Sequence, residues 1–381
     1  MEVINAAFDG LLGKIPCYNT IENWVKKCGL KVYETSGTSL QGGSYAQIVD
    51  ESMMIGSEKL LVTLGTPAEH PQRPLTHHDV EVLDISVAES WNGEAVGTQL
   101  KTAAGKVGSD PLYVISDNAS VISKGIRCSG FSQQRDISHS LGMFLERTYK
   151  NEPDFKEYIK LMTEPKFKYN MKKTAYLLPP TQRTVARFIN LSEWVKWSSK
   201  MLLNYHTLSA EERAVFSFVP KNASLIEELT EVVACVNKIE HLCKHKGLSK
   251  QTANQCRQKT KEHLLRGNSR MIRLAESINK FLADELKLIT KDMAHNNSSD
   301  IIESLFGKYK TRKSCNKLNG VTPFVLFVPI YAKLNSNIQN RTFDFKEALE
   351  AKKMNDLESW RKENLTPNLV QLRKNCLKKA A

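Results

Sequence analysis

Three carboxylates stand where the sequence could bring them together for chemistry. Asp50 ends an apolar run in QIVDES, Asp117 ends a second in YVISDNAS, and Glu303 lies in the helical stripe of SSDIIESLFGKYKTRK. Neighbouring parallel strands deliver the side chains at their carboxyl ends to one edge of a sheet. Adjacent carboxylates repel each other, and hard cations such as Mg²⁺ prefer oxygen ligands. The three acids therefore predict a site for two metal ions, suited to in-line displacement at phosphorus.

Each acid also has an ordinary structural interpretation. An aspartate at a strand end is usually a turn former or a helix cap, although Asn118 and Ser120 are expected to cap the helix after Asp117. Glu303 alone is a common type of exposed helix residue. The rival for the first position is Asp84 in VLDIS. Its strand is expected to run antiparallel to its neighbours and to end at another edge.

Short runs rich in valine, isoleucine and leucine predict strands around the first two acids. The runs SYAQIVDESMMIG, KLLVTLGT and VEVLDISVA come first, followed by a helical GEAVGTQLKTAAGKV, a buried strand DPLYVISDN, a helix SVISKGIR and a short strand QRDISH. This β-β-β-α-β-α-β order indicates an α/β fold with a mixed five-stranded sheet flanked by helices.

The chain turns wholly helical after His139 for about 150 residues. In this block, SLIEELTEVVACVNKIEHLCKHKG has apolar residues at helical spacing, and Gly247 is expected to end its helix. Near the start, NTIENWVKKCG predicts a helix capped by Asn19 and Glu22 and ended by Gly29. The N-terminal segment, residues 1–40, is expected to be bihelical, either a helix-turn-helix remnant or a packing hairpin. The core is expected in two parts, residues 41–150 and 294–335, with an all-helical insertion between them at 151–293 and a helical tail after them at 336–381.

Four strings carry a resemblance to a known family. QIVDESMMIGSEKLLVTLG, YVISDNASVISKGIR, RDISHSLGMFLERTYKNEPDFKEY and SDIIESLFGKYK, taken in this order, resemble a bacterial insertion-sequence DDE transposase over about residues 15–335. The resemblance implies a ribonuclease-H-like catalytic domain, interrupted by a large all-helical insertion before its last catalytic helix. It also implies metal-dependent DNA cleavage at element ends and strand transfer into target DNA.

The same resemblance assigns roles to the three acids. Asp50, Asp117 and Glu303 would be the catalytic residues and the ligands of two Mg²⁺ ions, which Mn²⁺ can replace. The expected partners are double-stranded DNA, as terminal repeats and target, and a second copy of the chain, since both element ends are handled together on DNA.

Positive charge follows the third acid directly. The residues concerned are Lys308, Lys310, Arg312 and Lys313. Lysine and arginine in such positions hold a phosphodiester backbone without reading its sequence. The alternative is a solvated face of the helix.

Further candidates for DNA contact lie outside this helix. His139 in DISHS follows the fifth predicted strand, where it either touches a scissile phosphate or packs. Trp194 or Trp197 would stack on a displaced base, as the resemblance implies, whereas a tryptophan at helical spacing is more often part of a core. Basic clusters lie nearby, at Lys166, Lys168, Lys172, Lys173, Arg183 and Arg187.

The composition favours a basic globular protein. A net charge of +13, from 54 Lys+Arg against 41 Asp+Glu, favours a polyanionic partner, nucleic acid before a membrane. The longest apolar run, VTPFVLFVPIYA, is too short to span a bilayer, and no signal-peptide pattern follows Met1. We therefore expect a cytoplasmic, DNA-associated protein.

The cysteines indicate reduced thiols. The eight cysteines of the chain form no CxxC pair. His241 and His245 flank Cys243 on a predicted helix, but Cys243 would point away from both histidines, which disfavours a zinc site.

Two other functions are compatible with these residues. One is a DNA-binding protein of transposase descent that no longer cuts, which the short stretch of about thirty residues before the predicted sheet makes plausible. The other is a nuclease of the same fold that hydrolyses DNA without strand transfer.

Overall fold

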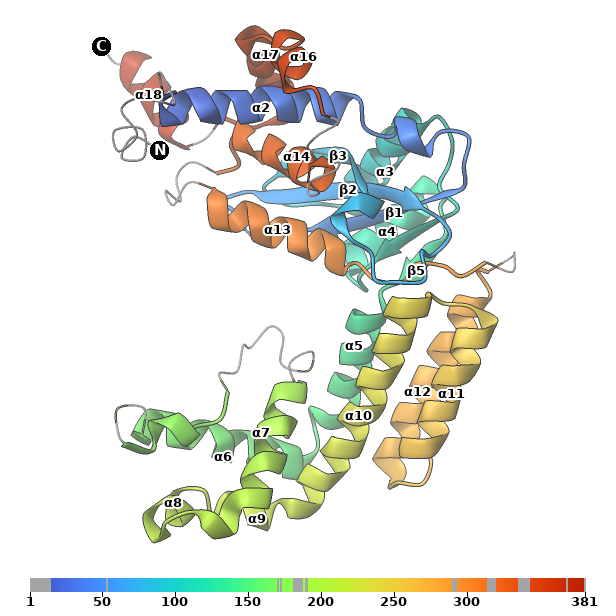
Figure 1. Ribbon diagram of the computed structural model, residues 1–381, viewed down its shortest axis with the longest axis vertical. Helices are drawn as coiled ribbons and strands as arrows, with labels where there is room; N and C mark the ends of the chain where they lie inside the picture. Colours follow the sequence, from blue (N-terminus) through green and yellow to red (C-terminus); the bar gives the residue numbers. More distant parts are fainter. Residues whose placement is uncertain are drawn as a thin grey trace. The chain divides into compact units, whose positions relative to one another are not determined.

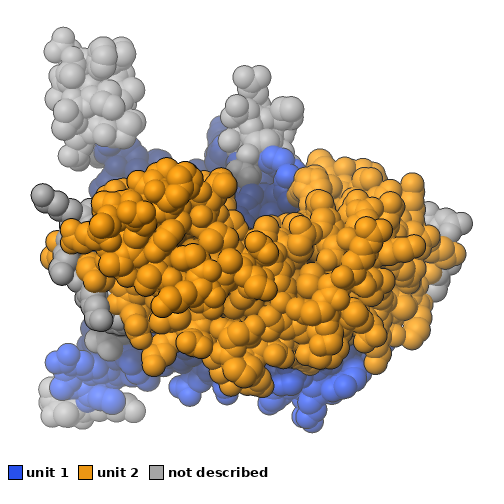
Figure 2. Space-filling view, turned by 90° about the horizontal axis from the view of Figure 1, so that it is seen from below, with its two compact units in different colours: residues 1–69, 75–133, 299–381 blue, residues 70–74, 134–298 orange. Residues whose placement is uncertain are grey.

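The computed structural model describes residues 15–52, 54–169, 171, 173–180, 188, 191–289, 293–313, 320–334, 343–367 and 369–379. The first predicted helix of the chain therefore lies outside the described residues. The chain divides into two compact units, which Figure 2 colours blue and orange. We call them the core unit (residues 1–69, 75–133 and 299–381) and the helical unit (residues 70–74 and 134–298).

A five-stranded mixed sheet organises the core unit, as the sequence predicted. The strand order is β3-β2-β1-β4-β5. Strand β1 runs antiparallel to β2 and parallel to β4, and β2 runs antiparallel to β3. The strands are Tyr45–Glu51 (β1), Lys59–Pro67 (β2), Glu81–Ala88 (β3), Tyr113–Ser116 (β4) and Gln133–Arg135 (β5).

Helices cover both faces of this sheet (Figure 1). On one face, α3 (Gly93–Val107) and α4 (Ser120–Ser129) bury an apolar cluster against β1, β2 and β4. On the other, α13 (Asp300–Arg312) packs against β1, and α14 (Phe327–Lys333) packs against β3. The sheet is therefore the middle layer of three, which is why its central strands are buried runs rather than alternating ones.

The first described helix differs from the prediction in both its cap and its end. Helix α2 (Tyr18–Glu34) begins after Cys17 without a side-chain cap. The helix continues through Gly29. This position is a glycine because the backbone of Leu326 lies close to it: a Cβ there would lie 2.1 Å from the carbonyl oxygen of Leu326. The expectation that Gly29 ends the helix is wrong, since tertiary contact with the short helix η7 (Pro323–Leu326) sets its role.

The helical unit is built around one apolar core. Its helices are Ile137–Tyr149 (α5), Pro153–Tyr169 (α6), Leu191–Asn204 (α7), Ala210–Val215 (α8), Phe218–Lys221 (α9), Ala223–Lys246 (α10), Lys250–His263 (α11) and Ser269–Leu286 (α12). The long α10 ends at Lys246, and Gly247 follows it with a φ of +66°, so the predicted helix end is confirmed.

The chain after α14 is helical where it is described. The remaining helices are Phe345–Glu350 (α16), Met354–Asn364 (α17) and Leu369–Lys379 (α18). Helices α16 and α17 pack against α2, the first described helix, within the core unit (Figure 1). No described helix combines the length and the apolar character needed to cross a membrane.

Candidate metal and DNA site

The two aspartates lie at equivalent ends of neighbouring parallel strands. Ile48 of β1 is paired with Ile115 of β4, and Asp50 and Asp117 each lie two residues further along. Both side chains are partly exposed, whereas the residues before them in each strand are buried. Because the strands are parallel and adjacent, this register brings both carboxylates to one edge of the sheet.

Local hydrogen bonds hold each aspartate at its strand end. The Oδ1 atom of Asp50 accepts from the N–H of Glu51 at 2.7 Å, and Oδ1 of Asp117 accepts from the N–H of Ala119 at 3.0 Å. Helix α4 has Ala119 as its N-cap residue and no side-chain cap. The expectation that Asn118 and Ser120 cap this helix is therefore wrong, because the turn leading into it is closed by Asp117 itself.

Gln133 fixes the backbone at the second strand end, a role that the sequence did not suggest. Its Nε2 donates to the hydroxyl oxygen of Ser116 at 2.9 Å, to the carbonyl oxygen of Asp117 at 3.2 Å and to the hydroxyl oxygen of Ser123 at 3.0 Å. One side chain from β5 thus joins β4 to α4 at the point where Asp117 leaves the sheet.

Glu303 lies in the first turn of α13, on its exposed side. The opposite side of this helix buries Ile301, Ile302, Leu305, Phe306 and Tyr309. The predicted apolar stripe is confirmed, and its burial places α13 against β1, the strand that carries Asp50.

The Lys310 ammonium connects two of the acids electrostatically. Burial lowers its pKa, while the carboxylates of Asp50 and Glu303 act in the opposite direction and raise it. Coulombic attraction weakens with distance and is screened by salt. The ammonium is therefore close enough to sense both carboxylates, one from β1 and one from α13.

The carboxylate oxygens of Asp50, Asp117 and Glu303 are suitable ligands for a hard divalent cation, but their positions do not yet form a metal site. Carboxylate oxygens are the ligands that Mg²⁺ prefers. Among the described residues, however, no three His, Cys, Asp or Glu side chains already lie close enough together to hold a metal ion. The described residues thus include a pair of aspartates in register and a glutamate on the adjacent helix, but no preassembled cluster of three ligands.

Asp84, the rival for the first position, has a structural role. It is 7% exposed on β3, and its carboxylate accepts from the hydroxyls of Tyr33 at 3.1 Å and Ser86 at 2.7 Å. Strand β3 is antiparallel to β2 and separated by it from β1. Asp84 therefore anchors α2 to the sheet.

The basic residues of α13 lie beside aromatic rings. Lys308 and Arg312 are exposed, and they lie over the rings of Tyr331 and Phe327 at 5.8 and 5.5 Å from the ring centroids. Lys310 is partly buried, and Lys313 follows the last turn of the helix. These aromatic partners were not predicted from the sequence, although the spacing of the rings in the apolar run after α13 was a usable signal.

The other predicted DNA contacts belong to the helical unit. The N–H of His139 donates to Oδ1 of Asp136 at 2.7 Å, in the first turn of α5. Trp194 is only 4% exposed within the apolar core, so its ring offers no open face to a base in this conformation. Trp197 is half-buried and donates to the carbonyl oxygen of Leu177 at 3.0 Å.

The basic clusters of the insertion are described only in part. Lys166 donates to the carbonyl oxygen of Pro180. The other predicted cations lie outside the described residues, either wholly or in their side chains: Lys168, Lys172, Lys173, Arg183 and Arg187.

The HLCKH segment follows the expected helical geometry. The rings of His241 and His245 are stacked with centroids 3.8 Å apart, while Cys243 is buried and faces Cys256 at an Sγ–Sγ distance of 3.8 Å. Cys243 therefore points away from the two histidines, as predicted.

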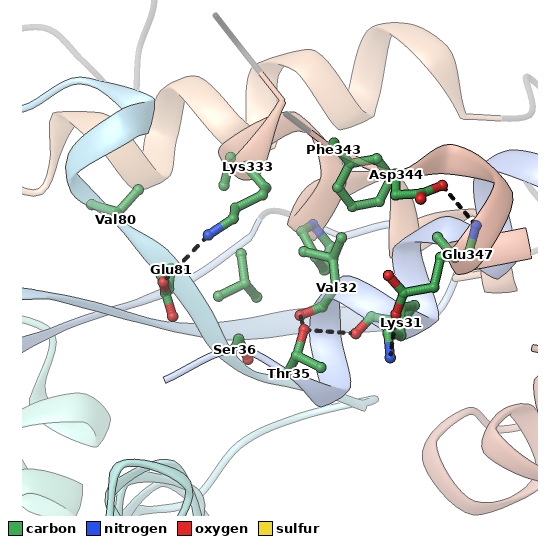
Figure 3. Close-up of a pocket in the computed structure, with 14 residues that line it drawn as sticks. Lys31, Val32, Thr35, Ser36, Val80, Glu81, Lys333, Phe343, Asp344 and Glu347 are labelled. Atoms are coloured by element: carbon green, nitrogen blue, oxygen red, sulfur yellow. Dashed lines mark hydrogen bonds and ion pairs between the residues drawn. The ribbon is translucent and has the colours of Figure 1, made fainter. Parts of the chain in front are cut away.

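A cavity of about 220 Å³ lies elsewhere in the core unit, between α2, α14, α16 and β3 (Figure 3). Ion pairs at its wall join Lys333 to Glu81 and Lys31 to Glu347, each at 3.8 Å. Since β2 separates β3 from β1, this cavity is distinct from the edge that carries the two aspartates.

Neither the protein-family models nor the curated proteins with which the chain was compared give a match.

Proposed function

We propose that this chain is a metal-dependent DNA transposase that cleaves DNA at the ends of an element and transfers the cut strand into target DNA. The observation that carries the proposal is the register of Asp50 and Asp117, each two residues beyond a matched pair on adjacent parallel strands. Glu303 supports it, because its helix packs on the first of these strands and Lys310 senses both Asp50 and Glu303.

The topology also supports a ribonuclease-H-like catalytic domain. Three antiparallel strands followed by a parallel β4, in the order β3-β2-β1-β4-β5, fit that fold. The helical unit enters the sequence between β5 and α13, where the family resemblance expects an insertion.

In this proposal Asp50, Asp117 and Glu303 would hold two Mg²⁺ ions, or Mn²⁺ ions in their place. Such ions lower the pKa of bound water and neutralise charge that develops on phosphate oxygens. Within the chain, Gln133 keeps Asp117 at the strand end. Lys310 supplies a positive counter-charge to Asp50 of β1 and Glu303 of α13.

The reaction proceeds in two displacements. Water attacks the phosphodiester at the element end, and the 3′-oxygen leaves with a proton as a hydroxyl. That hydroxyl then attacks a phosphodiester of the target. A new P–O bond joins the two DNA strands, the target's own 3′-oxygen leaves, and the proton lost by the attacking hydroxyl ends on that leaving oxygen. Lys308 and Arg312 hold the backbone during both steps, because their charges are exposed on the helix that carries Glu303.

The test uses duplexes made from inverted repeats flanking the coding region, with pre-cleaved 3′-hydroxyl ends, and Mg²⁺. The unaltered chain should join them to target DNA. Asp117→Asn should reduce joining on the order of a thousandfold or more, with DNA affinity unchanged within about twofold, since phosphate contacts dominate affinity. Glu89→Gln, an exposed acid of the same unit, is the matched control.

The same assay separates the alternatives. Cutting without joining would identify a nuclease, and binding without cutting would identify a DNA-binding protein of transposase descent. Joining by Asp117→Asn at the unaltered rate would contradict the proposed site.

A further inference from the structure

A row of aromatic rings runs beside the basic face of α13. The rings of Phe324 and Phe327 are stacked with centroids 5.6 Å apart and planes 8° from parallel, and the rings of Phe327 and Tyr331 are 5.7 Å apart. Helices α13 and α14 pack side by side (Figure 1). The three rings therefore form one continuous strip along α14 and the short helix before it.

The rings of this strip are not fully used in packing. Phe324, Phe327 and Tyr331 are each partly exposed. By contrast, Val325, Leu326 and Val328 of the same segment are 0%, 0% and 1% exposed and supply its buried side. The ring of Phe324 is also stacked on that of the buried Tyr309, with centroids 6.4 Å apart, and the ring of His77 lies 4.7 Å from that of Tyr331. The segment is thus anchored by its aliphatic residues and by these ring contacts, and the parts of the three rings that stay exposed can meet a ligand with flat apolar surfaces.

Cations alternate with the rings along the strip. Lys308 lies over the ring of Tyr331 and Arg312 over that of Phe327. Neither forms an ion pair with a carboxylate among the residues described here. A cation over an exposed ring is held weakly, so a phosphate close by would attract both side chains more strongly.

The strip runs along the helix that carries Glu303. Lys308 and Arg312 lie five and nine residues after Glu303, and at about 100° per residue they lie about 140° and 180° around the helix from it. Near the first turn, the Ser304 hydroxyl lies 3.4 Å from Nε2 of His77, and the ring centroid of His77 lies 4.7 Å from that of Tyr331. The Tyr331 end of the strip is therefore the end nearer to Glu303, and a DNA strand that is cut at the acids reaches it by passing around α13.

We propose that the strip binds unpaired nucleotides of a DNA strand next to the cleavage point, with bases on Phe324, Phe327 and Tyr331 and phosphates on Lys308 and Arg312. The inference rests on the proposed function and names the form of DNA that this face prefers. Charge complementarity favours DNA as the occupant, since exposed cations flank the rings and the net charge is +13. Alternating ring faces and cations suit unpaired strands of any sequence, because every base has a ring face that can stack.

The test compares two DNA probes in the absence of metal, with the full chain and fluorescence anisotropy as the readout. One probe is a blunt duplex, and the other is the same duplex with a short unpaired flank containing 2-aminopurine. The unaltered chain should bind the flanked probe about tenfold more tightly, because each stacked base adds measurably to affinity. The 2-aminopurine fluorescence should fall on binding.

Matched variants assign the preference to the strip. Phe327→Leu and Tyr331→Leu should remove most of the preference while leaving affinity for the blunt duplex unchanged within about twofold. Tyr331→Phe keeps the ring and should keep the preference. If a thermal melt shows that Phe327→Leu does not fold, the double variant Lys308→Gln, Arg312→Gln alters only exposed side chains. It should reduce flanked-probe affinity more than does the control Lys156→Gln, which alters an exposed lysine of α6 in the helical unit.

The outcomes distinguish this inference from the function on which it rests. Absence of binding to either probe would overturn the proposed function. Equal affinity for both probes, or a preference that survives Phe327→Leu and Tyr331→Leu, would overturn the strip alone.

Discussion

Arg270 in the helical unit and Arg312 in the core unit are the same residue type in opposite surroundings. Arg270 bonds both carboxylate oxygens of Glu228 at 2.6 Å and pairs with Asp154 at 2.8 Å, and its side chain is 14% exposed. Arg312 is exposed and lies over the ring of Phe327. The charge of the first arginine is paired with carboxylates inside the fold, whereas the charge of the second is exposed and can bind a ligand.

The same contrast extends to neighbouring polar groups. In the helical unit, the buried carboxylate of Glu285 accepts from Gln134 at 2.5 Å and from the N–H of Arg135 at 3.0 Å, and it pairs with the Arg135 guanidinium. On α13, by contrast, Lys308 and Arg312 have rings as their described neighbours. We therefore expect substitutions in the first region to affect stability and those in the second to affect binding.

The largest stability effect is expected at Arg270. Arg270→Ala leaves the carboxylate of Glu228, whose side chain is 9% exposed, without its charged partner, and only the Tyr149 hydroxyl and the Asn268 amide still donate to it. Breaking a buried pair in this way costs about 3 to 5 kcal/mol of unfolding free energy. Arg273→Ala is the control, since that side chain is 57% exposed and forms a solvent-exposed pair with Glu152 at 3.4 Å. This substitution should lower the free energy of unfolding by less than about 1 kcal/mol. Urea denaturation measures both, and equal losses would remove the contrast.

A pH effect of slightly smaller size is expected at His295. Burial lowers its pKa from 6.5 to about 4, and the residue is 1% exposed. Because the folded pKa lies below the unfolded value, stability is fully present above about pH 6.5 and is lost as pH falls towards 4, by about 2 to 3 kcal/mol.

The matched variant is His295→Gln, which does not titrate and can still bond the side chain of Gln134, the 3.2 Å partner of His295 Nδ1. Unfolding free energies at pH 7 and pH 4.5 should differ less in this variant than in the unaltered chain. An unchanged difference would show that other groups carry the pH dependence.

The smallest stability effects are expected on α13, together with a clear effect on DNA binding. Lys308→Gln and Arg312→Gln should each change unfolding free energy by less than about 0.5 kcal/mol, because both side chains are exposed. Each should lower the slope of log affinity against log salt by about one, as expected for a lost phosphate contact. Anisotropy titrations over a series of salt concentrations measure the slope, and an unchanged slope in both variants would contradict a DNA-binding role.

Local signals in the sequence predicted most of the core unit. Helix α3 runs from Gly93 to Val107, as predicted, because Asn92 caps its start at 2.9 Å and Gly108 ends it with a φ of +82°. These determinants lie within a few residues of the element that they define. The order of strands and helices along the chain followed from periodicity for the same reason.

Contacts between distant parts of the chain were not predictable in this way. Gly29 was expected to end a helix, yet it packs against Leu326. Trp194 was a candidate for DNA contact with a core position as the alternative, and it packs in a core that is assembled from several helices. The carboxylates of Asp50 and Glu303 both act on the pKa of Lys310 because α13 packs against β1. No local sequence pattern specifies that packing.

The measurement that tests the central claim most directly is a titration of the metal-free full chain with Mn²⁺. The electron paramagnetic resonance signal of free Mn²⁺ serves as the readout of binding. Asp50→Asn, Asp117→Asn and Glu303→Gln should each weaken binding about tenfold or more, while Glu89→Gln should leave it unchanged. Unaltered Mn²⁺ affinity in all three variants would mean that these carboxylates do not share a cation, in contradiction of the proposed site.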